Sequence, residues 1–175
     1  SRGFSFQKNG KLDMRMDQND KISAFEWINK ANEKEIADIF YFLGEERKSR
    51  LFAKRLVEKR RNKLIESTGE LAEVTYVGKK LRKSKKHPAT NIFRAIRIFI
   101  NNEFEEIKKA LHASIDLLQD KGRSVVISFH SMEDRIVKNF LKGKLENQEN
   151  TNAIKIIGKI IKPSLEEIHL NSRSR

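Results

Sequence analysis

The sequence lacks cysteine, long hydrophobic runs and any glycine-rich phosphate or dinucleotide loop. Without cysteine there is no disulfide framework, no thiolate nucleophile and no Cys-ligated zinc or iron–sulfur centre. No apolar run approaches the roughly 20 residues needed to cross a bilayer, and the N-terminus lacks the charged-then-apolar pattern of a signal peptide. These absences favour a soluble, cytoplasmic protein that has no membrane partner and no redox chemistry.

Charged residues make up 35% of the chain and hydrophobic residues only 38%. That balance is typical of helices with wide solvated faces around a modest core, so we expect more helix than sheet. Lys and Arg number 37 against 24 Asp and Glu, a net charge of +13. Such an excess favours polyanions, with nucleic acid as the first candidate. A basic proteome or a missing acidic remainder would also explain the charge, so charge alone decides nothing.

The 175 residues suffice for one domain with a sizeable core, or for a small domain with an insertion. The chain begins at Ser1 without an initiator Met and ends in polar, basic residues. We therefore expect it to be part of something longer.

Residues 21–86 carry the pattern of a small helical unit. After a loop over residues 3–20, the apolar spacing predicts two short helices that end at Gly44, the expected C-cap. Residues 45–62 predict an amphipathic helix with a basic outer face. Ser67 and Glu70 have capping-box spacing and open one more helix, which a basic run over residues 79–86 follows.

Residues 87–175 have a different pattern. Apolar residues recur every three or four positions from Phe93 to Leu118, which predicts one long helix with Thr90 as its N-cap. The apolar run over residues 124–129 predicts a strand buried on both faces, and residues 154–161 predict another. Ser131 is expected to cap the helix between them. A helix followed by a turn and a buried strand suggests a parallel α/β layer.

The junction between strand and helix, residues 127–135, is the most informative local feature. It places His130 and Ser131 outside the carboxyl end of a strand, where ligands gather in open α/β sheets. His130 either binds RNA or substrate or lies structurally beside the cap, and spacing alone favours the structural role. No G-x-S-x-G elbow supports a serine hydrolase. His130 and Asp134 lack a third ligand, so we predict no metal site.

Two other segments carry candidate side chains. The run LDMRMD at residues 12–17 places Asp13 and Arg15 in a loop, where spacing alone favours a local salt bridge with methionines filling a gap. The basic helix face that includes Arg55 and Arg60 is either a solvated surface or a ridge that contacts phosphates. A helix-turn-helix reader of DNA also stays possible.

Six motifs together resemble one family. They are RGFSF at 2–6, LDMRMD at 12–17, GEER at 44–47, KHPAT at 86–90, FRAIRIFINNE at 93–103 and VVISFHSMEDRIVKNF at 125–140. In this order they are similar to the S-adenosylmethionine-dependent methyltransferases of 16S ribosomal RNA cytosine N4, and KPSLEEI and SRSR near the end extend the likeness. Met132 stands where that family usually has Leu, and Asn91 where it usually has Arg.

The resemblance implies an α/β fold: an incomplete Rossmann-like methyltransferase sheet, formed by residues 1–20 and 87–175, with an inserted all-helical domain at 21–86. It implies S-adenosyl-L-methionine as cofactor, small-subunit ribosomal RNA as partner and methylation of a cytosine's exocyclic amine. It places Asp13, Arg15, His130, Ser131 and Asp134 in the active cleft, and Arg55, Arg60, Lys85 and Lys86 against RNA. The family's glycine-rich cofactor loop has no counterpart here, so no cofactor-binding residue is assigned.

Two further readings stay open at this point. The chain is either the substrate-side part of such an enzyme or a non-catalytic RNA-binding remnant or interaction module. A homo-oligomer is also possible, because unpaired sheet edges invite association.

Overall fold

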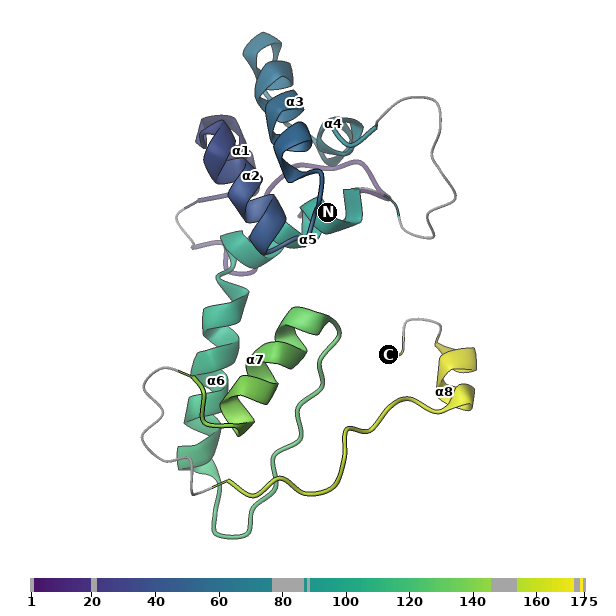
Figure 1. Cartoon of the computed structure of the whole chain (residues 1–175). Coiled ribbons are helices and arrows are strands. Elements are labelled where there is room, and N and C mark those ends of the chain that lie inside the picture. Colours follow the sequence, from purple (N-terminus) through teal and green to yellow (C-terminus); the bar gives the residue numbers. More distant parts are fainter. Residues whose placement is uncertain are drawn as a thin grey trace. The chain divides into compact units, whose positions relative to one another are not determined.

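The computed structural model describes residues 2–19, 22–76, 87, 89–145, 154–171 and 174. These residues form helices joined by loops (Figure 1). The helices are α1 (Ala24–Lys30), α2 (Glu33–Phe42), α3 (Ser49–Asn62), α4 (Thr68–Glu73), α5 (Ala89–Ile100), α6 (Glu103–Leu117), α7 (Ser131–Leu141) and α8 (Leu165–Leu170). The chain divides into two compact units, Ser1–Glu103 and Phe104–Arg175. The expectation of a helix-rich protein is confirmed.

Side chains at the helix starts explain where several helices of the first unit begin. Ser23 and Glu26 form a reciprocal capping box at α1, and Ser67 and Glu70 form the predicted one at α4. Asn32 caps α2 by accepting from the backbone N–H of Glu35. These bonds satisfy N–H groups that the first turn of a helix leaves without an intrahelical acceptor.

The first unit has a continuous apolar core. Helix α2 packs on α3 and on α5, and α1 packs on α5 (Figure 1). The largest fully buried side chains of this unit are Phe40, Phe52, Leu12, Met14, Ile28, Ile36, Leu56, Ile65, Leu71, Ile92, Ile96 and Ile98. Burying a side chain of this size stabilises a fold by about 1.5–3 kcal/mol. The predicted division at residues 20 and 87 stays a prediction.

The loop that precedes α1 is anchored on this core at both edges. The N–H groups of Ala24 and Phe25 donate to the carbonyls of Asp13 and Leu12, each at 2.7 Å. On the other side Leu12 N–H donates to the Glu66 carbonyl at 3.2 Å, and Lys11 pairs with Ser67 in an isolated antiparallel bridge. The loop is therefore a fixed part of the unit.

Gly44 is required for a reason other than the predicted C-cap. The cap of α2 is Leu43, and the residue with left-handed backbone is Glu45, with φ of 53°. A Cβ on Gly44 would lie 2.5 Å from the Phe40 carbonyl oxygen and 2.8 Å from that of Asn91. Gly44 thus permits close contact between the end of α2 and α5.

The predicted single helix from Thr90 to Leu118 is wrong in two respects. It is broken at Asn101–Asn102 into α5 and α6, and Asn102 adopts φ of 48°. Asn tolerates the left-handed region better than most residues, and its side chain competes for backbone bonds that continue a helix. Thr90 lies inside α5, which begins at Ala89, so Thr90 is not its N-cap.

The second unit contains α6, α7 and α8 and buries few side chains. Leu111 and Phe140 are its buried apolar residues among those described, and the His112 ring lies edge-on to the Phe140 ring at 5.4 Å. Among the described residues, no helix has both the length and the apolar character that crossing a membrane requires.

Neither predicted strand of the second unit is a strand in the part of the chain that the structure describes. Residues 124–129 and 154–161 are irregular, and Val125, Ile127 and Ile161 are exposed. A strand exists only where its backbone N–H and C=O groups pair with a neighbouring strand, and the described residues supply none. The apolar pattern alone therefore does not produce a sheet.

Candidate functional site

The loop at residues 12–17 is built around an unusual backbone turn at Met14. Met14 has φ of 59°, although its side chain is fully buried. A left-handed conformation is uncommon for a residue with a bulky side chain and persists where the surroundings over-determine it. Here Met14 N–H donates to the Arg2 carbonyl at 2.7 Å, and the Met14 carbonyl accepts from Asn101 Nδ2 at 2.8 Å. The turn is fixed from both sides.

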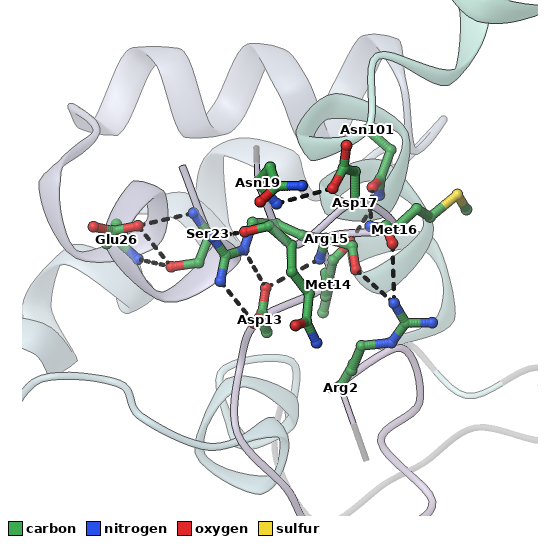
Figure 2. Close-up of polar contacts among 11 residues, drawn as sticks. Arg2, Asp13, Met14, Arg15, Met16, Asp17, Asn19, Ser23, Glu26 and Asn101 are labelled. Atoms are coloured by element: carbon green, nitrogen blue, oxygen red, sulfur yellow. Dashed lines mark hydrogen bonds and ion pairs between the residues drawn. The ribbon is translucent and has the colours of Figure 1, made fainter. Parts of the chain in front are cut away.

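Asn101 lies after the last turn of α5 and binds two points of this loop (Figure 2). Besides donating to the Met14 carbonyl, its side-chain oxygen accepts from Met16 N–H at 2.6 Å. The same amide nitrogen donates to the Arg97 carbonyl at 2.8 Å. One side chain therefore joins the loop to the end of α5.

Asp13 and Arg15 flank the buried Met14 and form a two-pronged ion pair (Figure 2). Arg15 Nε lies 2.6 Å from Asp13 Oδ1, and Arg15 Nη2 lies 3.0 Å from Asp13 Oδ2. About a quarter of each side chain is exposed. The predicted local salt bridge is present, but only one of the two methionines fills a gap, because Met16 is exposed.

The ion pair sets the charge of the Asp13 carboxyl. Its pKa is lowered from the ordinary value of 3.8, first by the hydrogen bond from the Arg15 side chain, and partial burial opposes this effect. Asp13 is therefore a carboxylate at neutral pH. It can accept a hydrogen bond from an N–H group, but it has no proton to donate.

Arg2 supports the far side of the loop. Its Nη1 donates to the Met16 carbonyl at 3.0 Å, and its guanidinium lies 5.3 Å from the centroid of the Phe4 ring. In the sequence, Arg2 stands out only as part of the RGFSF motif, and Asn101 only as part of the FRAIRIFINNE motif. The signal that would have found Asn101 is the Asn-Asn pair itself, because two Asn side chains compete for the backbone bonds that continue a helix.

In the second unit the cap of α7 lies one residue earlier than predicted. His130, not Ser131, is the N-cap: its Nδ1 accepts from Glu133 N–H at 3.4 Å, and the Glu133 carboxylate accepts from His130 N–H at 3.3 Å. The other ring nitrogen, Nε2, lies 3.1 Å from Glu133 Oε1, so both ring nitrogens face Glu133. The N-cap is the residue with extended backbone just before the helix, and its side chain must offer a hydrogen-bond acceptor. Here that residue is His130.

Ser131 is consequently the first residue of α7, and Asp134 pairs with Lys138 at 2.6 Å one turn further on. His130 also lies near Phe104, with ring centroids 6.2 Å apart. The described side chains include no group of three or more His, Asp or Glu placed to share a metal ion. That Asp13 and Arg15 share a cleft with these residues stays a prediction, because the two sets belong to different units.

Two of the residues predicted to contact RNA have partners within the fold. Arg55 Nη1 donates to the Tyr76 carbonyl at 2.7 Å. Arg60 donates to the carbonyls of Ile28 and Ala31 at the end of α1, and burial lowers the pKa of its guanidinium. Lys85 and Lys86 lie outside the described residues. RNA contact by all four stays a prediction.

Asn91, one of the two departures from the family pattern, has a defined hydrogen-bond partner. Its Nδ2 donates to Glu46 Oε2 at 3.0 Å. It thereby links α5 to the GEER segment, where Arg94 also donates to the Gly44 carbonyl at 2.5 Å.

Comparison with known proteins gives consistent matches along the whole chain. The MraW methylase family matches residues 1–175. Proteins named "Ribosomal RNA small subunit methyltransferase H" are similar to this chain: that of Ehrlichia canis is 45% identical over 182 residues and covers 100% of the chain. That of Rickettsia prowazekii is 46% identical and covers 99%, and that of Chromohalobacter salexigens is 40% identical and covers 100%. The chain spans 61%, 61% and 56% of the length of these three relatives, respectively.

Proposed function

The chain belongs to the MraW methylase family, and we propose that it is the substrate-side part of an enzyme that uses S-adenosyl-L-methionine to methylate the exocyclic amine of a cytosine in small-subunit ribosomal RNA. The observation that carries the proposal is the family match over residues 1–175, together with relatives of 40–46% identity that are named as small-subunit ribosomal RNA methyltransferases. The reaction would take place in the cytoplasm.

The fold that we propose for the whole protein is a Rossmann-like sheet with an inserted helical domain at residues 21–86. Support comes from the apolar character of residues 124–129 and 154–161, whose exposed Val125, Ile127 and Ile161 would be covered in a complete sheet. A homo-oligomer stays a prediction.

The described residues do not by themselves fit the cofactor. A hollow of about 260 Å³ in the second unit is lined by Ile107, Ala110, Leu111, Ser114, Ser124 and Val126. Two hydroxyls among apolar groups offer no charged partner for the amino-acid end of S-adenosylmethionine. We therefore assign no cofactor contact to this chain.

The chemistry proposed for this chain is to hold the methyl acceptor. The lone pair of a cytosine amine is delocalised into the ring, so the amine is a weak nucleophile and positioning must supply much of the catalysis. Asp13 is suited to accept a hydrogen bond from that amine, because Arg15 keeps it ionised and fixes its direction. His130 and Ser131, at the start of α7, are proposed to hold the edge of the cytosine ring or the phosphate of the same nucleotide.

The test is methyl transfer by the protein that carries this chain. Labelled S-adenosylmethionine and small-subunit RNA are incubated with it, and the RNA is digested and examined for N4-methylcytidine by mass spectrometry. The Ehrlichia canis relative is the positive control. Asp13→Asn, which retains an acceptor but loses the charge, should lower kcat by about 10- to 100-fold with a smaller effect on KM. RNA binding without N4-methylcytidine would instead favour the non-catalytic RNA-binding alternative.

A further inference from the structure

Four cations along the later turns of α3 are already engaged inside the first unit. Each has an ion pair or a backbone carbonyl as partner: Lys54 with Glu58, Arg55 with Tyr76, Lys59 with Glu73, and Arg60 with Ile28 and Ala31. A phosphate that bound these side chains would have to displace those partners. This part of the basic face is therefore less available to RNA than the sequence suggests.

The cations at the start of α3 are in a different state. Arg47, Lys48 and Arg50 are exposed, and within the described part of the chain no ion pair or hydrogen bond engages their side-chain nitrogens. The carboxylates of the same connection point to other partners. Glu45 lies 3.6 Å from Arg94, and Glu46 accepts from Asn91 and from the backbone N–H of Lys48.

Two exposed aromatic rings lie at the same connection, on the last turn of α2. Tyr41 is 54% exposed and Phe42 is 64% exposed, and their ring centroids are 5.1 Å apart at an interplanar angle of 83°. Glu46 N–H donates to the Phe40 carbonyl at 3.1 Å, which folds the connection back onto this turn. The helices that meet here, α2 and α3, lie side by side (Figure 1).

We propose that Tyr41, Phe42, Arg47, Lys48 and Arg50, the α2–α3 patch, dock an unpaired segment of RNA. Exposed rings and cations at one helix connection suit this occupant because an unpaired strand offers flat base faces to stack and one phosphate per nucleotide. A duplex hides its base faces, and three unengaged cations favour a polyanion over an apolar protein surface. The patch deepens the proposed function, since it rests on RNA as the substrate.

One carboxylate opposes the patch. Asp38 is exposed one turn before the two rings, and the described residues give its side chain no cation as partner. Asp38 should therefore repel a bound phosphate chain. Asp38→Asn should tighten RNA binding by about twofold at low salt.

The experiment is fluorescence anisotropy of this 175-residue chain with a labelled, unpaired oligoribonucleotide over a range of salt concentrations. Tyr41→Leu with Phe42→Leu, which keeps apolar volume but removes the flat rings, should weaken binding by about 10-fold. Replacing Arg47, Lys48 and Arg50 by Gln should reduce the slope of log affinity against log salt by about two. Arg61→Gln, an exposed cation at the other end of α3, is the matched control and should leave the slope unchanged.

An oligoribonucleotide of abasic sites separates stacking from charge. The two leucine replacements should have no effect on its binding, whereas the three glutamine replacements should weaken it as before. Unchanged affinity of the leucine variant for normal RNA would overturn the proposal. So would a change in the salt slope caused by Arg61→Gln that equals, residue for residue, the change caused by replacing Arg47, Lys48 and Arg50. Altered self-association in sedimentation with unchanged RNA affinity would assign the patch to a protein interface instead. Because the readout is binding by the chain, a failure of methyl transfer leaves it unaffected.

Discussion

Asn101 holds Met14 in a left-handed backbone conformation: its Nδ2 lies 2.8 Å from the Met14 carbonyl oxygen, and Met14 has φ of 59°. The two residues are 87 positions apart in sequence. The bond joins the end of α5 to the loop that carries Asp13 and Arg15. The direction of that ion pair therefore depends on a helix that is distant from the loop in sequence. Both belong to the first unit, and Met14 lies in its core.

Replacing Asn101 by Ala should destabilise the first unit. The change removes three side-chain hydrogen bonds, to the Met14 and Arg97 carbonyls and from Met16 N–H, and it leaves the strained turn at Met14 without its brace. We expect a loss of about 2 kcal/mol in the free energy of unfolding. Urea unfolding followed by the fluorescence of the single tryptophan, Trp27, measures it.

The matched control for this change is Asn62→Ala. Asn62 is an exposed Asn at the end of α3, and its replacement should change the free energy of unfolding by less than about 0.5 kcal/mol. Equal effects of the two replacements would show that Asn101 does not brace the loop.

Glu70 makes stability depend on pH. The hydrogen bond from the Lys63 side chain, followed by the backbone N–H of Glu66, lowers its pKa from 4.5 to about 2. Because the folded state binds the proton more weakly than the unfolded state, the stabilisation is present above pH 4.5 and is lost as pH falls toward 2. Glu70→Gln should cost about 1 kcal/mol at pH 7, since the Lys63 side of the pair is largely exposed.

The measurement is urea unfolding of both proteins from pH 7 to pH 2. The difference between the parent chain and Glu70→Gln should shrink steadily below pH 4.5. Glu33→Gln, at the exposed start of α2, controls for the loss of a carboxylate as such. A difference that stays constant down to pH 2 would mean that the charge of Glu70 is not what stabilises α4.

His130 should be more important than Ser131 for the start of α7. Because His130 is the N-cap, His130→Ala should cost about 1 kcal/mol, while His130→Asn should restore most of this loss, since Asn is among the best capping residues. Ser131→Ala should cost less than His130→Ala. Helical circular dichroism during thermal unfolding compares the three variants.

The same variants test the proposed role of His130 in methyl transfer. If capping is its whole contribution, His130→Asn should transfer methyl groups at the parent rate. A folded His130→Asn variant with kcat reduced 10-fold or more would show that the imidazole itself acts on the substrate. The Asn variant therefore separates the two readings that the sequence left open.

Local patterns in the sequence predicted what local forces decide. The capping box at Ser67 and the two short helices before Gly44 depend on side chains three or four residues apart, and the structure has them as predicted. The break at Asn102 was missed because the apolar period continues through it, while the two Asn side chains favour other backbone bonds.

Non-local partners explain the rest. Whether residues 124–129 form a strand depends on a neighbour that their own sequence does not contain. Asn101 could not be assigned to the loop at Met14 from spacing, because 87 residues separate them. The partners of Arg55, Lys59 and Arg60 on α3 likewise come from other segments, so a basic helix face alone did not distinguish engaged cations from available ones.

Arg60 gives the clearest separation between a structural and an RNA-contacting cation. Its guanidinium donates to the carbonyls of Ile28 and Ala31, where α1 leaves acceptors without intrahelical partners. Arg60→Ala should therefore cost about 2 kcal/mol in the free energy of unfolding. Arg60→Lys should recover only part of this loss, because an ammonium lacks the fork that serves both carbonyls. Arg61→Ala, at the exposed neighbouring position, should leave stability unchanged.

Under conditions where Arg60→Ala is fully folded, its affinity for unpaired RNA should stay within about twofold of the parent chain. A large loss of RNA affinity at unchanged stability would show instead that Arg60 contacts phosphate, as its place on a basic helix face first indicated.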